Sequence, residues 1–260
     1  MDRSRRIREI DGWRAVAIIA ILALHTVALR HLPASLGSAT IIGLTLRECL
    51  TAFGTPLFAL ISGIVLAHSW KRPFHTTSFY RRRFVKLGPA YVAVSMLYTV
   101  YPLASGQIPI EQAAFNLLTA SASDHLWFVL MISQLYLLYP ALSGLYDRSD
   151  QRGRLMAVAV ALLAQVAWNG FALYLAQRGT LVTFGGAVGE PWLLARRLCL
   201  TRVFCFCLGM VMGRDWFGRR ERFVLTRLHP LIPASALLFL STLTGLLQAV
   251  NLGILRFPAF

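Results

Sequence analysis

The sequence has few charged residues and very few acidic ones. Charged residues make up 14% of the 260 residues, and only 11 are Asp or Glu, against 26 Lys and Arg. Hydrophobic residues make up 57% of the chain, so a soluble domain of this size would expose far too much apolar surface to water. This composition excludes an ordinary soluble domain and an intrinsically disordered chain, and it predicts a membrane protein.

Cysteine is scarce as well. The chain contains only Cys49, Cys199, Cys205 and Cys207, which do not make the framework of a disulfide scaffold. Three of them lie in or beside one apolar segment, where we expect small hydrophobic side chains rather than a metal site. A Walker loop, a dinucleotide fingerprint, an HExxH motif and a G-x-S-x-G motif are all missing. Nothing in the sequence therefore points to ATP hydrolysis, a bound metal or a bound cofactor.

Apolar runs of membrane-spanning length fill most of the chain. A hydrocarbon core of about 30 Å needs about 20 apolar residues in a helix. Seven runs approach this length: 13–32, 50–70, 84–104, 125–146, 154–177, 197–213 and 229–249. The shorter run Ile110–Ala120 has apolar residues at helical spacing, which predicts an interfacial amphipathic helix. The sequence thus predicts an all-α, polytopic transmembrane helical bundle with about seven spans, in a single domain over 1–260.

Basic residues gather in the loops on one side of this predicted bundle. Of the 26, 19 lie in the N-terminal flank and in the second, fourth and sixth loops, whereas the third loop, Ser105 to Asp124, has none. Because cytoplasmic loops retain Lys and Arg during insertion, we expect a cytoplasmic N-terminus. The formal charge of +15 therefore reflects membrane topology, and we expect no nucleic-acid partner.

Two ionisable residues interrupt the first apolar run. Arg14 and His25 are eleven residues apart, which places both on one helix face, about 16.5 Å apart along the axis. An ionisable side chain near mid-bilayer costs about 2.5–3.5 kcal/mol, and histidine titrates near neutral pH. The pattern predicts a polar path from the cytoplasm, with Asp11 as an ion-pair partner of Arg14. Two structural roles stay open: Arg14 as a topology anchor, and His25 as a neutral, hydrogen-bonded histidine.

A basic and aromatic run opens the third predicted span. It contains Phe79, Tyr80, Arg81, Arg82, Arg83 and Lys86. Arginine makes bidentate contacts with phosphate and stacks on rings, so this run suits a bound polyphosphate with a stacked purine. The same residues would equally anchor a helix near anionic lipid.

Five further polar positions are weaker candidates. Ser62 precedes a glycine within a span, which favours close helix packing or a bend at a cavity. His125 and Trp127 begin the fourth span, where tryptophan fits an interfacial belt and His125 could equally be a group of an outer-side site. Arg202 falls inside the sixth predicted span and Glu190 precedes it, so the two could pair or line one cavity.

Five segments, in order along the chain, resemble the acyltransferase-3 family of integral membrane proteins. They are Glu9–Ile18 with His25, Thr55–Gly63, Phe79–Tyr91, His125–Pro140 and Phe206–Arg214. The resemblance implies an O-acyltransferase that moves an acyl group, such as acetyl, from cytoplasmic acyl-CoA to a hydroxyl, often of a cell-surface carbohydrate. It also implies a bacterial cytoplasmic (inner) membrane and about ten spans, so the seven predicted here would be a truncated, C-terminally incomplete copy.

On this resemblance, Arg14 and the cluster of Arg81, Arg82, Arg83 and Lys86 would bind acyl-CoA as a co-substrate. His25 would act as a general base or pass the acyl group outward. The chain departs from many relatives before Gln134, where Ile132 and Ser133 replace acidic residues, which weakens any inference about the acceptor. Two alternatives stay open: a secondary transporter, for which no internal repeat is seen, and an inactive, truncated acyltransferase.

Overall fold

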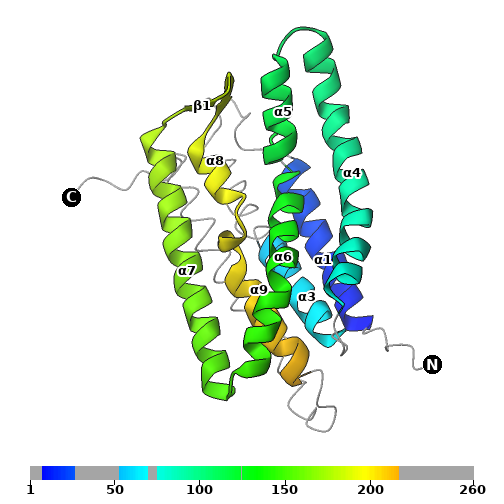
Figure 1. Cartoon of the computed structure of the whole chain (residues 1–260), viewed down its shortest axis with the longest axis vertical. Helices are drawn as coiled ribbons and strands as arrows, with labels where there is room; N and C mark the ends of the chain where they lie inside the picture. The colour runs from blue at the N-terminus through cyan, green and yellow to red at the C-terminus, as the bar shows by residue number, and fades with distance from the viewer. Residues whose placement is uncertain (1–7, 27–52, 70–74, 124, 217–260) are drawn as a thin grey trace, which may run out of the picture. The chain divides into compact units, whose positions relative to one another are not determined.

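The computed structural model describes residues 8–26, 53–69, 75–123 and 125–216, and these are mostly helical (Figure 1). The predicted span 229–249 lies outside the described residues. The chain divides into two compact units. The first unit comprises Met1–Ser69 with Leu208–Phe260, and the second comprises Trp70–Cys207.

The first unit is built on two packed helices, α1 (Arg8–Thr26) and α3 (Gly54–His68). Ile10, Ala17 and Ala20 form the buried stripe of α1. The helices meet closely at Gly54, where an added Cβ would lie 3.0 Å from the carbonyl oxygen of Ala17. Within lipid, helices associate through close van der Waals packing, and small residues make such contact possible.

A second close contact joins α3 to the end of α9 (Val203–Val211) and the π-helical turn η3 (Met212–Trp216). An added Cβ on Gly209 would overlap the carbonyl oxygen of Leu60, and one on Gly213 would overlap that of Ile64. Glycines four residues apart lie on one helix face, as in the small-xxx-small motif of membrane helices. Ser62 is buried in α3, which continues unbroken through it, and this favours the packing role for Ser62.

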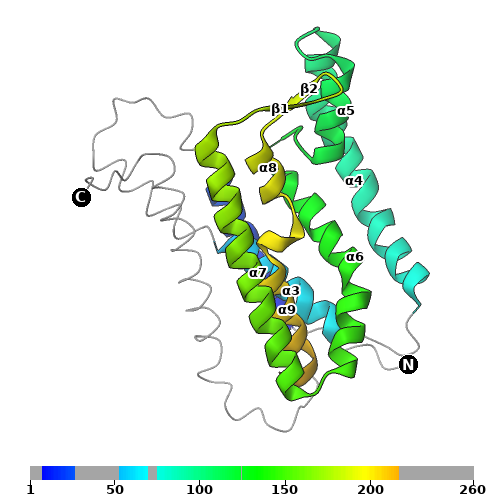
Figure 2. The same ribbon diagram turned by 60° about the vertical axis from the view of Figure 1, so that its left-hand side comes forward.

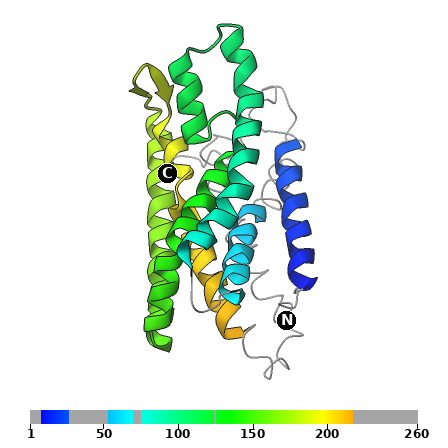
Figure 3. The same ribbon diagram turned by 45° about the vertical axis from the view of Figure 1, so that its right-hand side comes forward.

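The second unit contains α4 (Thr76–Ala104), α5 (Ile110–Thr119), α6 (Trp127–Arg148) and α7 (Gln151–Arg178). α5 folds back along α4 (Figure 3). The Tyr80 hydroxyl joins α4 to α6 by donating to the carbonyl oxygen of Leu137 over 2.9 Å. α7 starts where the Asp150 carboxylate accepts a bond from the Gly153 amide, and it ends at Gly179 with a φ of +58°, a favourable cap at each end.

The number of predicted spans is only partly confirmed. In the part of the chain that the structure describes, α4, α6 and α7 are long and apolar enough to cross a membrane, and they match the predicted runs 84–104, 125–146 and 154–177. The predicted short helix at Ile110–Ala120 is α5. The predicted runs 13–32 and 50–70 lie partly outside the described residues. Within those, α3 has 15 residues and the first two turns of α1 carry several charges, so neither adds to the three.

The predicted span 197–213 is wrong as a single helix. In its place, α8 (Pro191–Arg196), the 3-10 turn η2 (Cys199–Thr201) and α9 follow one another (Figure 2). The breaks between them leave backbone groups without helical partners. Irregular backbone at membrane depth is tolerated only where protein or a water-filled cavity satisfies those groups.

Side chains of α6 and α7 provide hydrogen-bond partners for the backbone groups at these breaks. Gln134 donates to the carbonyl oxygen of Arg197 over 3.0 Å and accepts from the amide of Cys199 over 3.1 Å. Trp168 donates to the carbonyl oxygen of Ala195 over 2.8 Å. Gln165 accepts from the amide of Phe204 over 3.1 Å. These bonds hold α8, η2 and α9 in place within the second unit.

The described residues are mostly helical, as the all-α prediction expects, and one short exception lies between α7 and α8. There, β1 (Val182–Phe184) and β2 (Ala187–Gly189) form an antiparallel hairpin. Its turn residues, Gly185 and Gly186, have φ values of +56° and +92°, which glycine adopts readily and which a two-residue hairpin turn needs. The hairpin is tied to α5, because Gln112 exchanges two hydrogen bonds with the backbone of Val188.

The glycine contact on α3 generates a stability prediction. We expect Gly209→Ala to lower the thermal unfolding temperature of the detergent-solubilised protein, because the new methyl group would force the helix away from the Leu60 backbone. The matched control is Gly170→Ala in α7, where an added Cβ meets nothing within 4 Å and alanine gains up to about 1 kcal/mol of helix propensity. An unfolding temperature for Gly209→Ala as high as that of the control would contradict the close contact.

Candidate functional site

Position 14 lies on the packed side of α1. Arg14 is about one turn from the buried residues Ile10 and Ala17. The expected ion pair with Asp11 forms, with 3.7 Å between Nη1 and Oδ1, and both side chains stay partly exposed, at 41% and 35%. His25 lies in the same helix, and helix geometry places it about 20° around the axis from Arg14. The two positions therefore share one face of α1, as predicted.

The structure divides the basic run of α4 into two sets. Arg81, Arg82 and Lys86 are exposed, whereas Arg83 is half-buried. The guanidinium carbon of Arg83 lies 5.1 Å from the ring centroid of Phe79 and 5.5 Å from that of Tyr136 on α6. Cation–π contacts of this kind stabilise a guanidinium that has left water. Of the four predicted donor-binding residues in α4, only Arg83 thus turns into the second unit.

A column of aromatic rings supports Arg83. Phe79 stacks on Tyr139 with 5.4 Å between centroids, and the edge of Phe206 meets Tyr139 at 6.3 Å. Tyr139 and Phe206 are almost completely buried. The Nε atom of Arg83 is buried too, and no acceptor within the described residues reaches it. Because buried N–H groups are nearly always satisfied, a guanidinium held this way suits an anionic ligand.

His125 and Trp127 lie where α6 begins. The Oγ atom of Ser123 is 3.0 Å from Nδ1 of His125, and the ring of Tyr98 meets the imidazole edge-on at 5.6 Å. Trp127 packs edge-on against Phe128. Leu137, which accepts the bond from Tyr80, is ten residues or about 15 Å further along α6. His125 is therefore well separated from the Arg83 cluster in the second unit.

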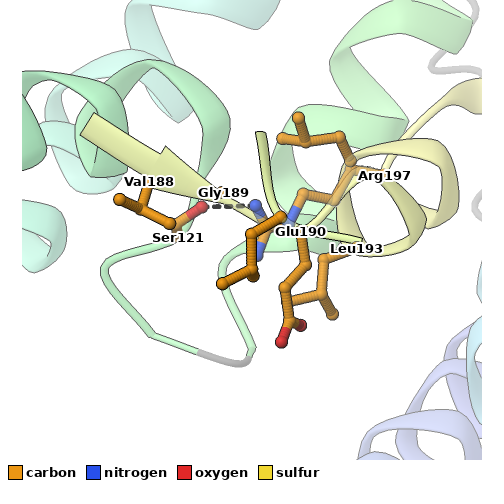
Figure 4. Close-up of a pocket in the computed structure, with 8 residues that line it drawn as sticks. Ser121, Val188, Gly189, Glu190, Leu193 and Arg197 are labelled. Atoms are coloured by element: carbon orange, nitrogen blue, oxygen red, sulfur yellow. Dashed lines mark hydrogen bonds between the residues drawn. The ribbon is translucent and has the colours of Figure 1, made fainter. Parts of the chain in front are cut away.

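A polar pocket lies between the hairpin, α8 and the segment after α5 (Figure 4). It has a volume of about 320 Å³ and is lined by Ser121, Leu181, Val188, Gly189, Glu190, Leu193, Leu194 and Arg197. Arg197 is only 8% exposed, and its guanidinium donates to the Ser121 hydroxyl. The pocket thus combines a buried cation, a carboxylate and a hydroxyl with apolar side chains.

Sequence reasoning missed this pocket, and the cavity that Glu190 and Arg202 were expected to share is not found within the described residues. Glu190 lines the pocket with Arg197, and Arg202 is not among the lining residues. Arg202 instead lies at the break before α9, where it donates to the carbonyl oxygen of Thr201 over 2.7 Å. The sequence contains one indication of a buried polar site here, because Arg197 lies between the apolar residues of α8 and those of α9. Ser121 carried no comparable signal.

In the described part of the chain, no group of three or more His, Cys, Asp and Glu side chains could hold a metal ion. Cys199 and Cys205 are buried free thiols, and Cys207 is partly buried. Their burial agrees with the expected role of cysteine as a small hydrophobic residue.

Comparison with known proteins gives a family. The chain is 24% identical over 205 residues to a Caenorhabditis elegans protein named Regulator of hypoxia-inducible factor 1. That match covers 65% of this chain and 40% of the nematode protein, so the chain spans less than half of this relative. No solved structure matches the chain. The acyltransferase-3 family model, described as an acyltransferase domain, matches residues 7–259, and the chain belongs to this family of membrane acyltransferases.

Proposed function

We propose that the protein is an O-acyltransferase that takes an acyl group, such as acetyl, from cytoplasmic acyl-CoA and transfers it to a hydroxyl acceptor of the carbohydrate type. Membership of the acyltransferase-3 family supports acyl transfer. The observation that carries the donor assignment is Arg83, whose guanidinium lies against two aromatic rings with a buried N–H to spare. Phosphate oxygens of coenzyme A would accept that N–H in a charge-assisted bond.

Arg81, Arg82 and Lys86 have a more limited part in this proposal. Their side chains are exposed on the first turns of α4, where they raise the local positive potential and attract an anionic donor or anionic lipid headgroups. Arg14 would add a phosphate contact of its own, with Asp11 fixing its side chain. We assign the specific contact to Arg83, because its half-buried guanidinium is screened less by water than those of its exposed neighbours, which strengthens a charge-assisted phosphate bond.

His25 supplies the proton transfer in this proposal. A neutral imidazole accepts the proton of the acceptor hydroxyl while the hydroxyl oxygen attacks the thioester carbonyl carbon. The carbon–sulfur bond then breaks, and the coenzyme A thiolate receives the proton from the imidazolium. The products are an ester and free coenzyme A, and His25 returns to its neutral form.

The membrane orientation follows from the distribution of basic residues. The N-terminus, the start of α4 and the α6–α7 turn would face the cytoplasm, and the α4–α5 turn would face the outside of a bacterial inner membrane. The described part of these loops fits this charge pattern, since Arg148, Arg152 and Arg154 flank the α6–α7 turn. Residues 105–123 carry no basic side chain.

Arg83 can be tested against its neighbour Arg82. We expect Arg83→Gln to weaken acyl-CoA binding by at least about tenfold, because a charge-assisted bond of about 1.5–3 kcal/mol is lost. Arg82→Gln removes the same charge from an exposed position and should change the Kd far less. Titration of purified protein with a non-hydrolysable acyl-CoA analogue gives both values, with thermal unfolding as the check on folding. Equal losses of acyl-CoA affinity in the two variants would mean that the basic run of α4 acts only as a general positive surface.

His25 can be tested by His25→Gln. Glutamine keeps a hydrogen-bonding side chain but has no basicity near pH 7, so turnover should fall by about 10²–10⁴ while expression and thermal unfolding stay near native. Rates of acyl transfer in membranes, measured with labelled acyl-CoA, provide the comparison. Near-native turnover of His25→Gln would show that His25 is a structural residue. His125 would then be the next candidate for the general base.

The orientation is tested with single cysteines in a variant that lacks the four native ones. Ser105→Cys in the α4–α5 turn should react with an impermeant thiol reagent added outside intact cells. Gln151→Cys at the start of α7 should react only after the cells are opened. Both side chains are exposed, so burial would not hide either one. Labelling of Gln151→Cys from outside would reverse the orientation.

A further inference from the structure

Tyr136 brings helix α6 to the guanidinium of Arg83. The guanidinium carbon lies 5.5 Å from the centroid of the Tyr136 ring and 5.1 Å from that of Phe79, which belongs to α4 itself. Arg83 is therefore held at a junction of two helices. Because an aromatic face attracts a guanidinium that has left water, the Tyr136 ring limits the directions in which Arg83 can present its N–H groups.

The hydroxyl of Tyr136 is not explained by this contact. The side chain is half-buried, and within the described residues its hydroxyl has no hydrogen-bond partner. The hydroxyl of a buried tyrosine usually finds one. The buried Nε atom of Arg83 also lacks an acceptor in the same part of the chain. Two donors that the described residues leave unsatisfied thus belong to one cation–π pair.

Other tyrosines of the second unit use their hydroxyls for structure. The Tyr80 hydroxyl donates to the carbonyl oxygen of Leu137 over 2.9 Å. The Tyr91 hydroxyl donates to the carbonyl oxygen of Leu117, which joins α4 to α5. Tyr136 has no comparable bond among the residues that the structure describes. Helix packing therefore accounts for its ring but not for its hydroxyl.

Contacts on both sides of Tyr136 fix it against α4. The bond from Tyr80 ends on Leu137, the next residue of the chain. Phe79 stacks on Tyr139, three residues beyond Tyr136, with 5.4 Å between ring centroids. The position and rotation of α6 are thus set at this point before a ligand arrives. A site formed in advance loses little side-chain freedom on binding, which favours affinity.

An anion with several acceptor oxygens suits these two donors. One phosphate oxygen can accept from Nε of Arg83 while another accepts from the hydroxyl of Tyr136. The hydroxyl is neutral, so it adds a directional contact without placing a second positive charge beside the guanidinium. The two side chains together define the orientation of a phosphate better than the arginine alone.

We propose that Tyr136 is a further donor-binding residue, whose ring positions Arg83 and whose hydroxyl donates to the same phosphate. This inference rests on the proposed function, because the acyl-CoA donor supplies the phosphate. The phosphate takes no part in the reacting bonds, and its contacts are the same in the ground state and the transition state. Loss of the Tyr136 hydroxyl should therefore raise the KM for acyl-CoA and leave kcat near native.

Two substitutions separate the hydroxyl from the ring. Tyr136→Phe removes only the hydroxyl and should raise the Kd of a non-hydrolysable acyl-CoA analogue by about tenfold, the effect of one lost hydrogen bond to a charged group. Tyr136→Leu also removes the ring that holds Arg83 and should weaken binding further. Isothermal titration of the purified full chain gives the Kd values, and transfer rates with labelled acyl-CoA give KM and kcat.

A double-variant comparison tests whether the two residues share one phosphate. In the Arg83→Gln background, Tyr136→Phe should raise the Kd clearly less than it does in the native chain, because residues that bind one group do not act additively. A purely structural hydroxyl would have no reason to depend on Arg83 in this way.

Tyr91→Phe is the matched control. It removes the same atom from a tyrosine of α4 whose hydroxyl has a backbone partner, eight residues from Arg83 along the chain. We expect Tyr91→Phe to lower the thermal unfolding temperature and to leave the Kd unchanged. Tyr136→Phe should do the reverse, because its hydroxyl has no structural bond to lose within the described residues.

The outcomes separate this inference from the proposed function. Native affinity for the acyl-CoA analogue in both Tyr136 variants would overturn the inference and leave the proposed function intact, since Arg83 could bind the phosphate alone. Equal effects of Tyr136→Phe with and without Arg83 would overturn it too, and so would loss of folding in Tyr136→Phe, which would reveal a structural hydroxyl. If the native chain does not bind the analogue, the donor assignment of the proposed function falls, and this inference falls with it.

Discussion

The need to satisfy the backbone of a broken helix is the constraint on which the second unit depends. A helix that stops and restarts within lipid leaves N–H and C=O groups that cost several kcal/mol each without a partner. Gln134 provides both a donor and an acceptor at one break, and Gln165 and Trp168 serve the neighbouring groups. The three side chains come from α6 and α7, so those helices must pack in one register. That register in turn positions Arg197 and the pocket.

Helix α6 links the two candidate binding regions of this unit. Gln134 contacts the segment that carries Arg197, and Tyr136, two residues later, contacts Arg83. Two residues along a helix correspond to a rotation of about 200° and a rise of about 3 Å. Gln134 and Tyr136 therefore contact Arg197 and Arg83 from nearly opposite sides of α6.

The sequence was most informative where a single physical requirement dominates. The helices α4, α6 and α7 followed from apolar length alone, because the bilayer thickness sets that length. The ion pair of Asp11 with Arg14 followed from their spacing of three residues. The family was recognisable because its segments occur in a fixed order, and the match over residues 7–259 agrees with that reading.

The sequence was least informative where contacts between distant residues decide the backbone. The break after α8 depends on Gln134, which is 63 residues from Arg197 along the chain, and hydropathy carries no trace of that bond. The hairpin was different, because its Gly185-Gly186 turn between two short alternating strands is a local signal. Hydropathy does not reveal it, because the two strands are only three residues long each beside much longer apolar runs. The basic run shows a third case, since its composition suggested an anion site but not which arginine turns inward.

The inward turn of Arg83 can be explained from helix geometry once the neighbouring helix is known. Phe79 and Arg83 are four residues apart, so they lie on the same face of α4. Phe79 is buried against Tyr139, which fixes that face towards α6. Arg81 points away by rotation, since it is about 200° around the helix from Phe79, whereas Lys86 returns to within about 20° of Phe79 and lies two turns further along α4. The inward position of one of the three arginines therefore arises from the burial of a phenylalanine, and the same packing that stabilises the helices also selects the arginine that we propose binds a phosphate.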